Sequence, residues 1–66
     1  MRVVLRNPKR ELDVPAPRNV GRLLHDLDIT AESVLVIRNN TLATHDERLR
    51  DDDVVEIRPV MSGGAV

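Results

Sequence analysis

Few side chains of this chain could take part in chemistry. Cys is absent, which excludes a thiol nucleophile, a disulfide and a thiolate zinc site. His25 and His45 lie far apart in the sequence with no third ligand close by, which is more typical of solvated surface histidines than of a metal site. The acidic run 51–53 lacks the alternating spacing and the glycine of a calcium loop, so we interpret it as a solvated turn. We therefore predict neither a catalytic side chain nor a metal site.

The C-terminal residues, Ser62-Gly63-Gly64-Ala65-Val66, offer a different kind of chemistry. A carboxylate is unreactive until one oxygen becomes a good leaving group, so it would have to be delivered to the ATP and magnesium site of another enzyme. Glycine has no Cβ and lets the backbone enter a narrow channel, which suits Gly63 and Gly64 to delivery and disfavours Val66. The alternative interpretation is a frayed terminus without function.

The first elements that must position this tail form a hairpin. Residues 2–6 alternate and predict a strand with Val3 and Leu5 on one face, and residues 11–14 predict a second strand. Residues 7–10 between them have the composition of a turn. Pro15 and Pro17 then end the ladder, because proline has no N–H to donate.

One amphipathic helix is predicted after the hairpin. Asn19 is a suitable N-cap, and the helix ends near residue 27 or 28. Its apolar stripe has the spacing i, i+3, i+4 and i+7 and consists of Val20, Leu23, Leu24 and Leu27.

The second half of the chain predicts further strands. Residues 34–37 form an apolar run suited to the middle of a sheet, and Asn39-Asn40 forms a tight turn into a short return strand at 41–43. Residues 44–49 form a loop or a single helical turn. Residues 54–58 are the last strand, and Pro59 interrupts its pairing on one side.

This order indicates an α+β fold in which the first and last strands lie side by side at the centre of a mixed sheet. With four to five strands and one main helix, it is a β-grasp, or ubiquitin-like, roll over residues 1–61. Residues 62–66 then form a flexible Gly-Gly tail with an Ala-Val extension.

Composition narrows the classes of function. The chain has 66 residues, a formal charge of −1, and no Phe, Tyr or Trp. We expect no nucleic-acid partner, since a basic footprint and base-stacking rings are both missing. No apolar run approaches the ~18 residues of a membrane span, so we expect a cytoplasmic protein. A core built from aliphatic side chains leaves little material to wall a deep pocket, which disfavours an enzyme.

Three features together resemble a known protein family. They are the opening of the first strand, Met1-Arg2-Val3-Val4-Leu5, the order of the elements, and a final strand that runs into Ser62-Gly63-Gly64. Over residues 1–64 the chain resembles the ThiS/MoaD family of small prokaryotic sulfur carriers of the thiamine and molybdopterin pathways. It is most similar to those carriers that also serve tRNA thiolation.

The resemblance implies that the carboxylate of Gly64 is adenylated with ATP and Mg by a ubiquitin-activating-type adenylyltransferase. Sulfur from a donor such as a cysteine desulfurase or rhodanese would then give a thiocarboxylate, which a sulfur-accepting synthase consumes. No cofactor would be bound by the carrier itself. Ala65 and Val66 depart from the family pattern, so they would first be removed by a JAMM-type or other peptidase.

A partner surface is expected beside the tail. If Val3, Leu5, Val55 and Ile57 face the helix, Val4 and Val60 point outward. Together with Arg58 and Met61 they would be placed where an activating enzyme must bind. The alternative to a partner surface is a solvated face without a binding role, on which Arg2, Arg6 and Arg58 form ion pairs with Glu11 and Glu56.

Two other functions stay open. The chain is alternatively a ubiquitin-like modifier joined through Gly64 to lysines of target proteins, with Lys9 its only own lysine. It is otherwise a non-catalytic interaction module whose tail has no role.

Overall fold

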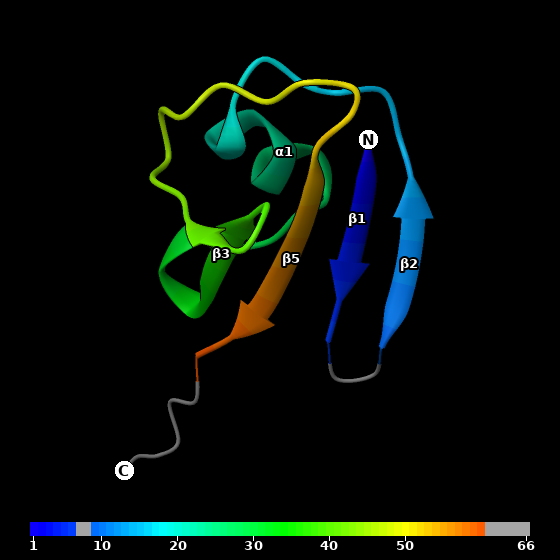
Figure 1. The fold of residues 1–66 in the computed structure, drawn as a ribbon. Helices are drawn as coiled ribbons and strands as arrows, with labels where there is room; N and C mark the ends of the chain where they lie inside the picture. The colour runs from blue at the N-terminus through cyan, green and yellow to red at the C-terminus, as the bar shows by residue number, and fades with distance from the viewer. Residues whose placement is uncertain (7–8, 61–66) are drawn as a thin grey trace, which may run out of the picture.

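The computed structural model describes residues 1–6 and 9–60. Its elements follow the order strand, strand, helix, and then three more strands (Figure 1). They are β1 (Arg2–Leu5), β2 (Arg10–Asp13), α1 (Val20–Asp26), the short 3-10 helix η1 (Ala31–Ser33), β3 (Val34–Arg38), β4 (Thr41–Leu42) and β5 (Val54–Pro59). In this part of the chain, no helix is long and apolar enough to cross a membrane.

All five strands form one mixed sheet in the order β2-β1-β5-β3-β4. β1 and β5 are parallel neighbours, while β1 with β2, β3 with β5 and β3 with β4 are antiparallel. The first and last strands therefore lie side by side at the centre, and α1 crosses one face of the sheet (Figure 1). This is the expected β-grasp architecture.

The core lies between α1 and the sheet and is aliphatic, as the composition requires. Val3, Val20 and Val55 are fully buried, and Leu23, Leu24 and Ile57 nearly so. The expected inward face of the central strands is thereby confirmed. The remaining buried apolar side chains are Met1, Val36 and Leu49.

The first turn of α1 has a partner for every backbone N–H that the helix itself leaves free. Asn19 is the N-cap, and its Oδ1 accepts from the N–H of Arg22 at 2.9 Å, as predicted. The N–H groups of Val20 and Gly21 donate to the carbonyls of Glu47 and His45 at 3.1 and 2.9 Å. The loop at 44–49 thus caps a helix that is distant in sequence, a role that its composition did not reveal.

The last turn of α1 ends in a Schellman motif. The N–H of Ile29 donates to the carbonyl of Leu24 at 2.9 Å, and that of Asp28 to His25 at 3.1 Å. Asp28 has φ of 59°, the left-handed conformation that glycine usually supplies here. Asn39 and Asn40, with φ of 50° and 70°, form the predicted tight turn between β3 and β4.

Strand boundaries differ slightly from the expected ones. β2 begins at Arg10 and ends before Val14, and β4 ends before Ala43. β5 continues through Pro59, which lies opposite Val34 on the β3 side after the pairing with β1 has ended at Ile57. The missing N–H of Pro59 thus limits pairing on one side only, as expected.

The prediction of a solvated turn is wrong for Asp53, although Asp51 and Asp52 are exposed. The Asp53 side chain is only 4% exposed. Its carboxylate accepts hydrogen bonds from Arg38 Nε at 2.7 Å, Asn39 Nδ2 at 2.9 Å and the backbone N–H of Arg50 at 2.8 Å. The bond with Arg38, above all, lowers the pKa of Asp53 to about 2. Asp53 therefore joins the start of β5 to the β3–β4 turn.

Candidate functional site

The candidate site is the face of the sheet turned away from α1, next to the end of β5. Val3, Val36, Val55 and Ile57 point into the core, so their neighbours along each strand point outward. We call the outward residues nearest the end of β5 the outer patch. It consists of Val4, Arg6, Leu35, Ile37, Glu56, Arg58 and Val60.

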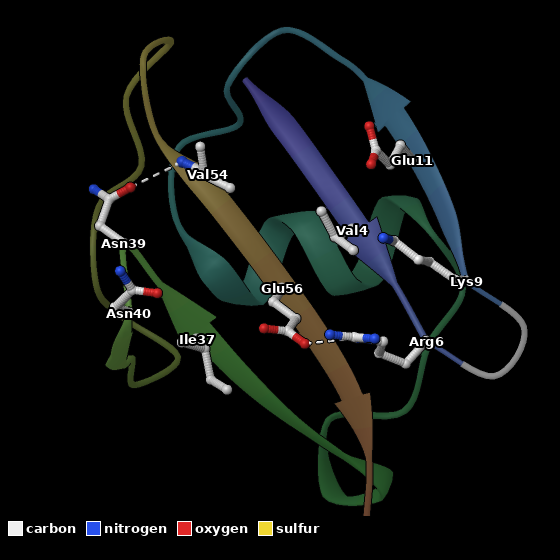
Figure 2. Close-up of a pocket in the computed structure, with 9 residues that line it drawn as sticks. All are labelled: Val4, Arg6, Lys9, Glu11, Ile37, Asn39, Asn40, Val54 and Glu56. Atoms are coloured by element: carbon white, nitrogen blue, oxygen red, sulfur yellow. Dashed lines mark hydrogen bonds and ion pairs between the residues drawn. The ribbon is translucent and has the colours of Figure 1, made fainter.

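The strand register brings the members of the outer patch together. Glu56 on β5 lies opposite Val4 on β1 and Ile37 on β3. Figure 2 shows these three side chains on one face, with Arg6 reaching toward Glu56 from the end of β1. Leu35 lies opposite Arg58 one step closer to the end of β5. A shallow depression bounded by Val4, Arg6, Ile37 and Glu56 lies on this face.

The outer patch exposes apolar side chains close to the point where the chain leaves the sheet. Leu35 is 45% exposed and Val60 is 39% exposed. The N–H of Val60 donates to the carbonyl of Ser33 at 2.9 Å, which fixes the last described residue against the start of β3. Further along the same sheet, Leu42 and Val54 are also exposed. Apolar side chains gathered on one face are typical of a protein-binding surface.

The charged members of the outer patch form one cluster. Glu56 Oε2 accepts hydrogen bonds from Arg6 Nε and Arg58 Nε, both at 2.8 Å. The bonds with Arg58 and then Arg6 lower the pKa of Glu56, so this carboxyl is ionised at neutral pH. Arg2 lies farther along the face, with its Nε 3.9 Å from Glu11 Oε1. The ion pairs expected on this face are therefore present.

The structure places the predicted surface residues as follows. Val4, Arg58 and Val60 lie on the outer face beside the end of β5. Met61, Ser62, Gly63, Gly64, Ala65 and Val66 lie outside the described residues. Sequence reasoning did not include Leu35 and Ile37 in this surface. Their alternation with Val36 was the available signal, but an unbroken apolar run conceals which residues face outward.

Neither histidine belongs to this surface. The His25 side chain is 77% exposed on α1, with Nδ1 3.8 Å from Asp26 Oδ1. His45 contributes its backbone carbonyl to the capping of α1. Over residues 1–6 and 9–60, no three His, Cys, Asp or Glu side chains gather in a way that could hold a metal ion.

Comparison with known proteins identifies a family and a curated relative. The model of the ThiS family matches residues 3–64, which is nearly the whole chain. The matched range ends at Gly64 and includes Gly63. A sulfur carrier protein of Thermus thermophilus, TtuB, is 37% identical over 65 residues, covering 97% of this chain and 100% of the relative.

Proposed function

Because this chain belongs to the ThiS family, we propose that it is a sulfur carrier whose Gly64 carboxylate is adenylated and then converted to a thiocarboxylate. The observation that carries the proposal is the family match through Gly64, on a chain 37% identical to a sulfur carrier protein. The β-grasp fold and the final strand leading toward Gly63-Gly64 support it. The sulfur would serve the biosynthesis of a cofactor, a modified tRNA or an amino acid.

The chemistry needs little from the carrier itself. An oxygen of the Gly64 carboxylate attacks the α-phosphorus of ATP on the activating enzyme, and pyrophosphate leaves. The terminal sulfur of a persulfide on a desulfurase or rhodanese then attacks the carbonyl carbon and AMP leaves, which gives an acyl disulfide. A second thiol, on the donor enzyme or from a thiol reductant, attacks this disulfide, so that a new disulfide forms and Gly64 is left as a thiocarboxylate. The carrier contributes one carboxyl group and a surface that the activating enzyme binds. The activating enzyme supplies the magnesium and the electrophile, which is the α-phosphorus of ATP.

Gly64 must be the last residue before activation. Any residues that follow it, such as Ala65 and Val66, would be removed by a JAMM-type or other peptidase. A β-branched side chain at the reacting end would widen the segment that enters the ATP site, whereas two glycines keep it narrow. Cleavage after Gly64 would therefore switch the carrier on.

The outer patch would hold the carrier on the activating enzyme during the reaction. Its exposed Leu35 and Val60 lie at the end of β5, directly before the segment that ends in Gly64. Val4 and Ile37 extend the apolar surface across β1 and β3, and Met61 follows directly in the sequence. Docking at this position leaves the last residues free to reach into the enzyme.

The test uses a chain that ends at Gly64, incubated with the activating enzyme of its own host, ATP, magnesium and a sulfide source. Intact mass should show one oxygen replaced by sulfur. The same chain with Gly64→Ala tests the need for glycine, and the chain that still ends at Val66 should gain no sulfur. Absence of a thiocarboxylate on the Gly64-ended chain would contradict the proposal.

A further inference from the structure

We infer that Arg6 and Arg58, held together by Glu56, form a binding element for carboxylates on the surface of the activating enzyme. We call these two residues the arginine pair. The inference rests on the proposed function and adds the chemistry of the partner surface. It follows from the hydrogen bonds within the outer patch, the charges around it and the number of residues that separate it from Gly64 in the sequence.

The hydrogen bonds orient the two guanidinium groups of the arginine pair but leave some of their N–H donors without a partner among the described residues. Both Nε atoms donate to the same oxygen, Glu56 Oε2, at 2.8 Å. Among the described residues, neither guanidinium has another hydrogen-bond partner, and the side chains of Arg6 and Arg58 are 44% and 52% exposed. Each guanidinium therefore keeps its two terminal NH₂ groups for a partner, in the planar fork that binds a carboxylate through two bonds. Glu56 fixes the direction of both forks.

The charges around the arginine pair favour an anionic partner. Arg6 and Arg58 outnumber the single acid between them, and Lys9 lines the same depression. Glu11 lines this depression as well, opposite Val4, but its Oε1 lies 3.9 Å from Arg2 Nε, so its charge is balanced by a third arginine. Asp13 lies farther along β2, opposite Arg2. The part of the outer face around the end of β5 is thus positive, although the chain as a whole carries a formal charge of −1. A local positive region attracts an acidic surface and orients its approach.

The neighbouring apolar side chains indicate that the anionic partner is a protein surface and not RNA. Leu35 lies directly opposite Arg58 in the sheet, and Val60 follows Arg58 by two residues. A protein surface can cover these apolar side chains and present carboxylates to the arginine pair in the same contact. A phosphate backbone would leave them in water, and the chain has no Phe, Tyr or Trp ring on which a base could stack.

The position of the arginine pair limits where the carboxylates can be. Gly64 follows Arg58 by six residues, and a fully extended chain of that length spans at most about 20 Å. Once the reach of the arginine side chain and of the Gly64 carboxylate is added, the acidic side chains of the activating enzyme must lie within about 30 Å of the phosphorus that Gly64 attacks. Docking of the arginine pair would hold the carrier close enough for Gly64 to reach the ATP site.

The test is ATP–pyrophosphate exchange by the activating enzyme with carriers that end at Gly64, at several salt concentrations. Arg6→Gln and Arg58→Gln should each raise KM for the carrier about tenfold, with kcat little changed. Arg58→Lys keeps the charge and loses the fork, so it should raise KM nearly as much. Arg22→Gln removes the same charge from α1 and is the matched control. Far-UV circular dichroism checks that each variant is folded.

Glu56→Gln separates orientation from charge. The substitution makes the outer patch more positive while it weakens the bonds that orient the arginine pair. We expect KM to rise severalfold, whereas attraction by charge alone would lower it. A fall in KM for this variant would therefore overturn the role given to Glu56.

The remaining outcomes are distinct. If the unsubstituted carrier supports no exchange, the proposed function fails and the inference fails with it. If exchange occurs but Arg6→Gln and Arg58→Gln match the Arg22→Gln control, only the inference is overturned. If these variants instead weaken binding to tRNA, measured by fluorescence anisotropy, and leave KM unchanged, the anionic partner is a nucleic acid and the inference is again wrong.

Discussion

Asp53→Asn tests the buried polar cluster that joins β3, its following turn and β5. Asp53 Oδ2 accepts from Arg38 Nε and the N–H of Arg50, and Oδ1 accepts from Asn39 Nδ2. An asparagine at 53 keeps one oxygen and turns the other into a donor. Asn39 cannot rotate its amide to accommodate this donor, because its own Oδ1 accepts from the N–H of Val54 at 2.9 Å. At least one hydrogen bond is therefore lost.

The expected cost follows from the charge and the lost bond. A carboxyl pKa that falls from 3.8 to about 2 on folding contributes about 2 kcal/mol to stability at neutral pH. Leaving a buried donor unpaired adds about 1 kcal/mol. We therefore expect Asp53→Asn to reduce the free energy of unfolding by about 3 kcal/mol, a large share of the stability of a domain this small.

Urea unfolding followed by far-UV circular dichroism measures this cost, since the chain lacks Trp and Tyr for fluorescence. With an m-value of about 1 kcal/mol per M, the midpoint at pH 7 should fall by about 3 M. The exposed neighbour provides the control Asp52→Asn, which should shift the midpoint little. A midpoint for Asp53→Asn equal to that of the control would refute the reasoning.

The lowered pKa also predicts how the difference depends on pH. A depressed carboxyl pKa stabilises the fold fully above the unfolded value of 3.8, and this contribution disappears as the pH falls through about 2. The gap between the unsubstituted chain and Asp53→Asn should therefore narrow between pH 4 and pH 2. A gap that stays constant over this range would contradict the assigned cause.

Three further predictions concern stability and use the same urea assay. Asn19→Ala removes the acceptor for the N–H of Arg22 and should cost about 1 kcal/mol; an unchanged midpoint would mean that the loop at 44–49 suffices to cap α1. Asp28→Gly relieves a left-handed residue with φ of 59° and should stabilise the chain by up to about 1 kcal/mol; destabilisation would show that the Asp28 side chain does more than tolerate this conformation. Ile57→Val removes one methyl group from a side chain that is 2% exposed and should cost about 1 kcal/mol; no loss would mean that the core collapses around the change.

The fold was predictable from the sequence because the local sequence patterns indicate the same elements that the packing of the core requires. The stripe of α1 from Val20 to Leu27, its cap at Asn19 and the Asn39-Asn40 turn each have a short-range physical cause that is visible in the sequence. The pairing of β1 with β5 followed from two apolar strands at the ends of the domain. Short-range signals leave element boundaries uncertain by a residue or two, as the ends of β2 and β4 show.

The parts that sequence did not reveal depend on contacts between distant residues. Asp53 has the same type and neighbours as a solvated turn residue, and only the fold brings Arg38 and Asn39 to it. The capping of Val20 and Gly21 by the loop at 44–49 is likewise a tertiary contact. At the candidate site, alternation placed Val4 and Arg58 on the outer face and predicted ion pairs with Glu56. That Arg6 and Arg58 share one oxygen of Glu56 required the side-chain geometry.

The central claim is that Gly64 becomes the reacting terminus of a sulfur carrier. The intact mass of the protein purified from its own host tests it most directly. We predict a chain that ends at Gly64, with a fraction in which one sulfur has replaced one oxygen. A mass that retains Ala65 and Val66 and carries no sulfur under all growth conditions would contradict the claim and favour a plain interaction module. Adducts joined to lysines through Gly64, with no thiocarboxylate, would instead favour a protein modifier.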